Sequence, residues 1–334
     1  MINIVILSQA DFAGSAYQAA CAINSVKKFN VRCVSMSKHP FDFPHDIIIP
    51  CHQDSHKGTF AKECENYEEV MQLLNDADLI HLWNDIDQDP KYMDFEKGGI
   101  NIPLGKPIVV TMTGSLYRNE HVRLNTIIKE RGYKLVVQNP MLRFLDEIES
   151  VFIPHAVDTE FLQPLQRNNE KITLGVYFGH YYATVGEDRN FLMSCIKDKN
   201  INVIDHLSRK ILWKEHIEFI KNCDILYHGI KISEIVKYIG RSSLEAMAMG
   251  IPVITFVNEQ KAIELSEGKI GSYIPIYNTK LEQLKNHLDE LIKNLDLRIG
   301  LGIDGRKWVE RHFSYKTVGE QYSKIYEEVL NGIV

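Results

Sequence analysis

Short apolar runs alternate with longer stretches of helical periodicity along the first half of the chain. Apolar, β-branched runs are typical of buried strands, whereas apolar residues spaced three and four apart are typical of amphipathic helices. Such alternation predicts a parallel sheet with helices on both faces. The predicted strands are residues 2–7, 31–36, 47–50, 79–83, 108–112, 135–138 and 151–153, and the predicted helices are residues 15–28 and 67–75.

The second half of the chain repeats this plan. A polar stretch at residues 158–171, which contains Pro164, is the predicted linker between the two halves. The sequence therefore predicts an α/β protein with two sheets of similar size and a cleft between them. The predicted strands are residues 172–178, 202–204, 225–227 and 253–256, and the predicted helices are residues 190–197, 215–223, 244–249, 279–294, 297–312 and 315–330.

Length and composition fit a globular protein with two domains. The chain has 334 residues, of which 45% are hydrophobic and 25% charged, and no apolar segment is long enough to span a membrane. The N-terminus lacks a basic leader, so we expect a cytoplasmic protein, with peripheral contact at the inner face of a membrane left open. A net charge of −6 gives no bulk attraction to nucleic acid.

Residues 238–256, which read YIGRSSLEAMAMGIPVITF, combine a turn, a short helix and a buried strand. Gly240 opens the turn, the predicted helix covers residues 244–249, and Gly250 followed by Pro252 ends it. A turn that leads into a helix N-terminus presents backbone N–H groups to an anion. This segment is therefore the strongest candidate for a phosphate site.

The start of the same helix carries one carboxylate, Glu245. Its side chain is a candidate to accept hydrogen bonds from sugar or ribose hydroxyls. The residues alone leave a second interpretation open, in which Glu245 only complements the helix dipole while Ala246 and Ala248 permit close packing. The backbone N–H groups that would face a diphosphate are those of Arg241, Ser242, Ser243 and Leu244.

The run from Leu244 to Ile254 resembles the donor-binding segment of the retaining glycosyltransferases of family 4, which have the GT-B fold of two facing Rossmann-like domains. That segment has a pattern close to E-G-F-G-x-x-x-L-E-A-M-A-x-G-x-P-V-I. Residues 152–161, FIPHAVDTEF, resemble the family's I-P-N-G-V-D-x-x-x-F, and residues 78–81 and 107–115 resemble two of its first-domain segments. The similarity is strongest after residue 225.

The resemblance implies a domain arrangement and an activity. Residues 1–158 would form an N-terminal, acceptor-side domain, residues 159–312 a C-terminal domain that binds the nucleotide sugar, and residues 313–334 a helix that packs back on the first domain. The implied enzyme is hexosyltransferase-like and transfers a sugar from a nucleotide diphosphate to a hydroxyl acceptor with retention, without metal or other cofactor. A glycan or lipid-linked acceptor in surface polysaccharide synthesis is the expectation from the family.

The chain departs from the family pattern in three respects. Lys237 stands where the family usually has the first of two glutamates, and Thr113 stands where it usually has histidine. The family's Gly-Arg and Lys pair, which neutralises the leaving diphosphate, is replaced by Gly179-His180 and, further on, Arg189. Because developing negative charge needs a nearby cation, His180, Arg189 and Lys237 are the candidate catalytic residues.

The first half of the chain contributes further candidates. Gly14 lies between the first strand and the first helix, where a Rossmann-like fold places a phosphate-binding turn, and Ser15 is the expected helix cap. Ser115 and Arg118 follow the strand at residues 108–112 and are candidates for the acceptor side of the site. The Gly14 segment is not G-x-G-x-x-G, which argues against an ordinary nicotinamide enzyme.

The residues give less support to metal binding and to other functions. Asp85-Ile86-Asp87 has the form of a D-x-D metal site, but an Asp-rich solvated loop explains it equally well. The run Cys51-His52, His56 and Cys64 matches no usual zinc spacing, and reduced, largely buried thiols are expected. Two alternatives stay open: a catalytically silent GT-B protein that binds a nucleotide sugar or a partner, and a DNA-modifying glycosyltransferase.

Overall fold

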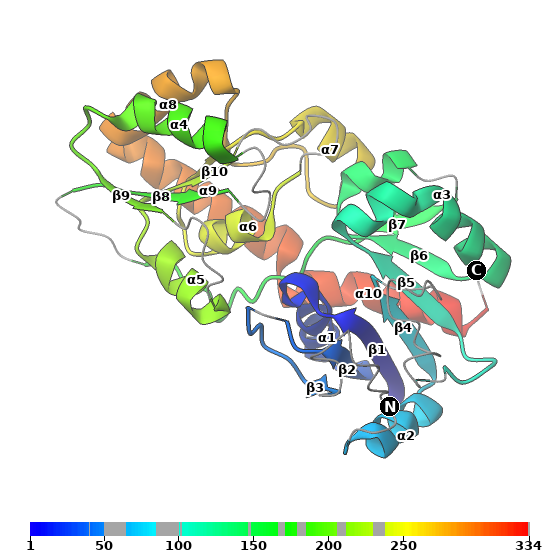
Figure 1. The fold of residues 1–334 in the computed structure, drawn as a ribbon. Coiled ribbons are helices and arrows are strands. Elements are labelled where there is room, and N and C mark those ends of the chain that lie inside the picture. Colours follow the sequence, from blue (N-terminus) through cyan, green and yellow to red (C-terminus); the bar gives the residue numbers. More distant parts are fainter. Residues whose placement is uncertain are drawn as a thin grey trace. The chain divides into compact units, whose positions relative to one another are not determined.

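The computed structural model describes residues 1–39, 41–49, 65–84, 100, 102–145, 148–165, 171–178, 185–205, 212–229 and 238–332. They form two compact units (Figure 1). Unit 1 comprises Met1–Ala156 and Tyr315–Val334, and unit 2 comprises Val157–Ser314. Among the described helices, none is long and apolar enough to cross a membrane.

Unit 1 is built on a parallel sheet of seven strands in the order β3-β2-β1-β4-β5-β6-β7. The order reverses between β1 and β4, which is the point where open α/β sheets bind ligands. The strands are β1 Ile2–Ala10, β2 Phe29–Ser37, β3 Ile47–Ile48, β4 Leu79–Trp83, β5 Ile108–Met112, β6 Lys134–Val137 and β7 Ser150–Phe152, and the α-helices are α1 Ser15–Ser25, α2 Tyr67–Asp76, α3 Gly114–Arg131 and α10 Tyr315–Leu330.

Unit 2 has a parallel sheet of five strands in the order β12-β11-β10-β8-β9. Its reversal lies between β8 and β10. The strands are β8 Thr173–Tyr177, β9 Asn202–Asp205, β10 Ile225–His228, β11 Val253–Thr255 and β12 Tyr277–Asn278, and the α-helices are α4 Val185–Ile196, α5 Trp213–Lys221, α6 Arg241–Ala248, α7 Glu259–Leu265, α8 Leu284–Lys293 and α9 Leu295–Phe313.

Most predicted strands are confirmed to within one or two residues, but several helices differ from their predicted bounds, and α4 begins five residues before the predicted start at residue 190. The sequence missed α3, because polar residues dominate the segment and only some of its apolar residues, among them Tyr117, Leu124 and Ile128, are buried. The helix predicted at residues 279–294 is shorter, because Thr279 continues the strand ladder by donating its N–H to the Thr255 carbonyl. A short 3₁₀ turn, Leu281–Gln283, then leads into α8.

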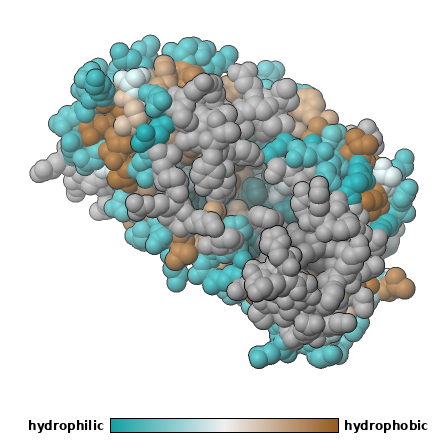
Figure 2. All heavy atoms as spheres, in the orientation of Figure 1, coloured by the Kyte–Doolittle hydropathy of each residue, from teal (hydrophilic) through white to brown (hydrophobic). Residues whose placement is uncertain are grey.

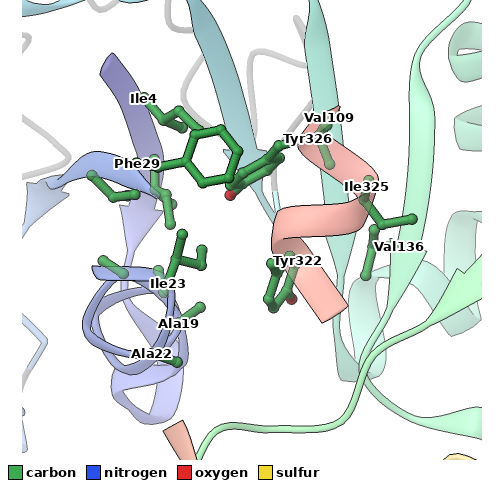
Figure 3. Packing of buried hydrophobic residues seen from close by; sticks show 14 of the residues in the cluster. Ile4, Ala19, Ala22, Ile23, Phe29, Val109, Val136, Tyr322, Ile325 and Tyr326 are labelled. Atoms are coloured by element: carbon green, nitrogen blue, oxygen red, sulfur yellow. The ribbon is translucent and has the colours of Figure 1, made fainter. Parts of the chain in front are cut away.

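Helix α10 lies in the core of unit 1 although it is separated in sequence from the rest of that unit. Figure 3 shows its Tyr322 and Tyr326 on the side that faces Ile23 and α1, and its Ile325 beside Val136 of β6. The helix approaches α1 so closely that a Cβ at Gly319 would lie 2.1 Å from the Ala22 carbonyl oxygen. A glycine at position 319 is therefore required by the packing.

A buried histidine joins α10 to the sheet of unit 1. His81 in β4 is 0% exposed, with its Nδ1 2.7 Å from the Tyr326 hydroxyl and its Nε2 2.7 Å from the Thr111 hydroxyl. Burial lowers the pKa of His81 from 6.5 to about 3, so the ring is neutral at physiological pH. Both ring nitrogens thus have partners inside an apolar core.

The Tyr326 hydroxyl is expected to stabilise unit 1 through this contact. Tyr326→Phe leaves one buried nitrogen of His81 without its partner, which costs about 1–3 kcal/mol of the free energy of unfolding. Urea denaturation measures the loss. Tyr273→Phe, at a tyrosine that is 53% exposed, is the control and should change little. Equal effects of the two substitutions would contradict the role of the hydroxyl.

The same histidine predicts a pH dependence of stability. Unfolded His81 takes up a proton below about pH 6.5 while the folded ring does not until about pH 3, so the unfolded state binds more protons in between. The free energy of unfolding should fall as the pH falls through this window, by up to about 1.4 kcal/mol per pH unit. His81→Gln should show a shallower slope in urea denaturation between pH 6 and pH 4, and parallel profiles would refute this origin.

Candidate functional site

The N-terminus of α6 differs from the prediction at its first turn. Gly240 is the extended residue before the helix, and its carbonyl accepts the N–H groups of Ser243 and Leu244 at 3.0 and 3.2 Å. Residues Arg241 to Ser243, predicted as a turn, are therefore helical, because the Gly240 carbonyl closes the first helical turn. Two of the four N–H groups predicted to bind an anion are consequently engaged within the helix.

His228, at the carboxyl end of β10, lies against this helix start. Its Nδ1 is 2.6 Å from the hydroxyl oxygen of Ser243, and its ring centroid is 5.3 Å from that of Tyr177 at the end of β8. A Cβ on Gly240 would lie 2.5 Å from Cε1 of His228. The absence of a side chain at Gly240 therefore makes room for the imidazole. Because His228 ends β10, its ring lies where the strand order of unit 2 reverses.

Glu245 is a buried carboxylate held by three side chains. Its Oε1 accepts from Nε of Arg241 at 3.0 Å and from the indole N–H of Trp213 at 3.4 Å, and its Oε2 lies 3.4 Å from Nε2 of His216. The Glu245 side chain is only 4% exposed. Burial would raise the pKa of Glu245, but Arg241 and His216 outweigh it and hold the pKa at about 2. Glu245 is therefore ionised throughout the physiological range.

Helix α5 supplies two members of this cluster that the sequence did not single out. The predicted helix began at Glu215, which left Trp213 outside, but the Glu215 carboxylate accepts the Leu212 N–H at 3.0 Å and extends the helix start. Trp213 and His216 then lie one turn apart and both reach α6. The only sequence signal was their three-residue spacing, which is typical of one helix face.

The three candidate cations differ in what the structure shows. Arg189 lies in α4, and its Nε donates to Oδ2 of Asp205 at the end of β9 over 3.1 Å. Its side chain is 40% exposed. His180 and Lys237 lie outside the described residues. Their assignment as catalytic residues stays a prediction, and Arg189 already has a carboxylate partner.

The carboxyl edge of the unit 1 sheet holds Gly14 in a left-handed turn with φ of 62°. The carboxylate of Asp11 accepts the N–H groups of Ala16 and Tyr17 at 2.8 and 2.9 Å, so an internal anion already lies at the start of α1. The cap expected from Ser15 therefore comes from Asp11, because Ser15 is the first helical residue and its hydroxyl accepts the indole N–H of Trp83.

Ser115 and Arg118 lie in the first turns of α3, directly after β5. Thr113 precedes the helix, and its N–H and hydroxyl both donate to Oδ1 of Asn84, at 2.6 and 2.8 Å. Arg118 is half-buried. Unit 1 thus contains the acceptor-side candidates and Gly14, whereas unit 2 contains Arg189 and the cluster around Glu245.

No three metal-ligating side chains gather anywhere in the described part of the chain. The D-x-D candidate at residues 85–87 and the cysteine and histidine run at residues 51–64 lie outside it. Of the cysteines that are described, Cys33, Cys195 and Cys223 are buried and Cys21 is half-buried.

Comparisons with known proteins find matches among solved structures. No family model and no curated protein sequence matches the chain. An α-glucosyltransferase in complex with UDP and a 13-mer DNA has a TM-score of 0.67 at 11% identity, covering 98% of this chain and 100% of that one. HepE from Anabaena in complex with UDP-glucose has a TM-score of 0.63 at 12% identity, with the same coverage. A glycosyltransferase from Rickettsia africae has a TM-score of 0.61 at 15% identity, covering 98% of both chains.

These similarities establish the fold. The chain is an α/β protein with the GT-B fold, as the sequence predicted. Identities of 11 to 15% carry no residue roles from those proteins to this one. The function must be argued from the side chains of this chain.

Arg241 and Glu245 are expected to be strongly coupled in stability. Arg241→Met removes the closest partner of a buried carboxylate, which should lower the free energy of unfolding by about 3 kcal/mol. Adding Glu245→Gln removes the uncompensated charge, so the double variant should be more stable than Arg241→Met alone. A double-mutant cycle by urea denaturation measures this coupling, and additive effects would show that the pair does not form.

Proposed function

We propose that this chain is a glycosyltransferase that transfers a sugar from a nucleoside diphosphate to a hydroxyl acceptor. The observation that carries the proposal is the buried cluster at the start of α6, formed by Arg241, Glu245 and His216 beside the ends of β8 and β10. A helix N-terminus where the strand order reverses suits a phosphate-containing ligand. The UDP and UDP-glucose in two similar structures support a donor of this class.

The reaction we propose retains the anomeric configuration and uses no metal, as the family resemblance implies. The bond between the anomeric carbon and the diphosphate oxygen breaks, and the diphosphate leaves with the electron pair. The acceptor oxygen bonds to the same face of that carbon, and its proton passes to the departing diphosphate. The start of α6, together with His180, Arg189 and Lys237, would stabilise the negative charge.

Arg189 would exchange partners in this scheme. Its guanidinium bonds to Asp205 in the ligand-free protein, and a diphosphate would compete for the same donors. Because the Arg189 side chain is 40% exposed, the exchange requires no buried ion pair to break. Asp205 would then keep Arg189 oriented toward the carboxyl edge until the donor binds.

Glu245 would bind the ribose of the donor. A carboxylate offers about four acceptor positions, and three donors already approach this one. His216 lies against Oε2, and Arg241 and Trp213 lie against Oε1, so a ribose hydroxyl would be the second donor to Oε2. The low pKa of Glu245 keeps the acceptor charged, which strengthens a hydrogen bond from a hydroxyl.

Nucleotide binding is expected to depend on the charge of Glu245. Glu245→Gln should weaken binding of the preferred diphosphate among UDP, GDP and CDP about tenfold, because a hydrogen bond to a charged acceptor becomes neutral. Calorimetric titration measures the affinity. Inorganic pyrophosphate lacks a ribose and should bind both proteins equally, and Glu264→Gln, at a carboxylate in an exposed i,i+3 pair, is the control variant. Absence of nucleotide binding by the parent protein would overturn the donor-site assignment.

Turnover separates the enzyme from the silent alternative. An active transferase releases nucleoside diphosphate from its nucleotide sugar when an acceptor is present, whereas a silent protein binds the donor without release. Glycan, lipid-linked and duplex DNA acceptors can be compared in the same assay. Transfer to DNA would select the DNA-modifying alternative, for which the net charge of −6 gives no support.

A further inference from the structure

Phe161 is an exposed aromatic residue stacked on a member of the Glu245 cluster. Its ring centroid lies 5.8 Å from that of Trp213 with an interplanar angle of 27°, and the residue is 55% exposed. Leu212, the residue before Trp213, is also 43% exposed. Figure 2 shows that hydrophilic residues cover most of the described part of the face that it draws, with hydrophobic residues in separate groups. We call Phe161 and Trp213 the aromatic step.

The backbone holds Phe161 in place despite its exposure. Its N–H donates to Oδ1 of Asp158 at 2.9 Å, and the next residue, Leu162, is buried. The guanidinium of Arg306 on α9 donates to the carbonyls of Leu162 and Thr159. These bonds fix the turn that carries Phe161, so the ring is presented to solvent by an ordered segment. An ordered aromatic ring loses little conformational entropy when a ligand covers it.

Arg306 also ties this turn to α6. The same guanidinium donates to the carbonyl of Ala248, the last residue of α6, at 2.6 Å. A Cβ on Gly302, one turn earlier in α9, would lie 2.2 Å from the Gly250 carbonyl oxygen, so α9 and the end of α6 are in close contact. The aromatic step and the Glu245 cluster are therefore connected through one packed assembly in unit 2.

Trp213 contacts both parts of this arrangement. Its ring stacks on Phe161, and its indole N–H lies 3.4 Å from Oε1 of Glu245. A ligand hydroxyl bound at Glu245 would thus lie next to the Trp213 ring, which is part of the flat apolar surface that Trp213 and Phe161 form. In a nucleotide the base is bonded directly to the ribose, so a ribose at Glu245 brings a planar ring next to Trp213.

We propose that Phe161 and Trp213 form the platform on which the nucleobase of the donor stacks. The inference rests on the proposed function, because it takes Glu245 as the ribose site. Stacking on aromatic side chains accepts any base, since every base has a π-face, and it contributes at the scale of hydrogen bonds. Trp213 then has two tasks, because its indole N–H positions Glu245 while its ring supports the base.

The test compares nucleotide and base-free ligands on variants of Phe161. Phe161→Leu keeps an apolar side chain but removes the aromatic face, and should weaken the preferred nucleoside diphosphate about tenfold in calorimetric titration. Ribose 5-phosphate, which lacks a base, should bind the variant and the parent equally. Phe161→Tyr keeps the ring and should restore the parental affinity. Phe144→Leu, at a phenylalanine of unit 1 that is 51% exposed, is the matched control and should change nothing.

Indole fluorescence gives an independent readout. The chain has three tryptophans, and Trp83 and Trp308 are 1% and 7% exposed, so stacking of a base should quench emission from Trp213. The quenching on addition of nucleotide should disappear in Trp213→Phe. Unchanged nucleotide affinity in Phe161→Leu, or equal losses for ribose 5-phosphate and nucleotide, would overturn the aromatic step while leaving the donor site intact. A parent protein that binds no nucleotide would overturn both proposals.

Discussion

The cluster in unit 2 depends on one buried charge. Glu245 is only 3% exposed, and an isolated carboxylate at such a position would be strongly destabilising. Arg241 from the same helix and His216 and Trp213 from α5 compensate it, so the charge determines which side chains must meet. The requirement fixes α5 against the start of α6. Glu245 is thus an acidic residue among the buried residues of α6, next to Leu244 and Ala246.

The core of unit 1 also contains a polar side chain that needs partners, but this side chain, His81, is neutral. His81 is fully buried and stays uncharged, and its two ring nitrogens need partners from Thr111 in β5 and Tyr326 in α10. One imidazole therefore links adjacent strands to a helix from the far end of the sequence. In both units a polar side chain inside the core restricts how the surrounding elements can pack. Hydrogen bonds are directional, so they specify one arrangement of these elements more strictly than apolar contacts alone.

The sequence predicted those features that depend on local patterns. Short apolar runs located the strands, and the L-E-A-M-A-x-G-x-P-V-I run located α6 and β11. It failed where particular hydrogen bonds decide the outcome. The helical state of Arg241 depends on the Gly240 carbonyl, and the cap of α1 depends on Asp11 in place of Ser15. Two partners of Glu245, Trp213 and His216, come from a helix some 30 residues earlier. The roles of His180 and Lys237 stay predictions, since the structure does not describe either residue.

The place of α10 has a consequence for the order of folding. Unit 1 is discontinuous in sequence, because residues 315–334 follow the whole of unit 2 yet belong with residues 1–156. During synthesis the seven-stranded sheet is made first but must wait for Tyr322 and Tyr326 to cover His81 and the apolar residues around it. Until then the surface that α10 will occupy is open to water and to other chains. A nascent unit 1 is therefore an incomplete domain, because its core is covered only after residues 315–334 have been synthesised.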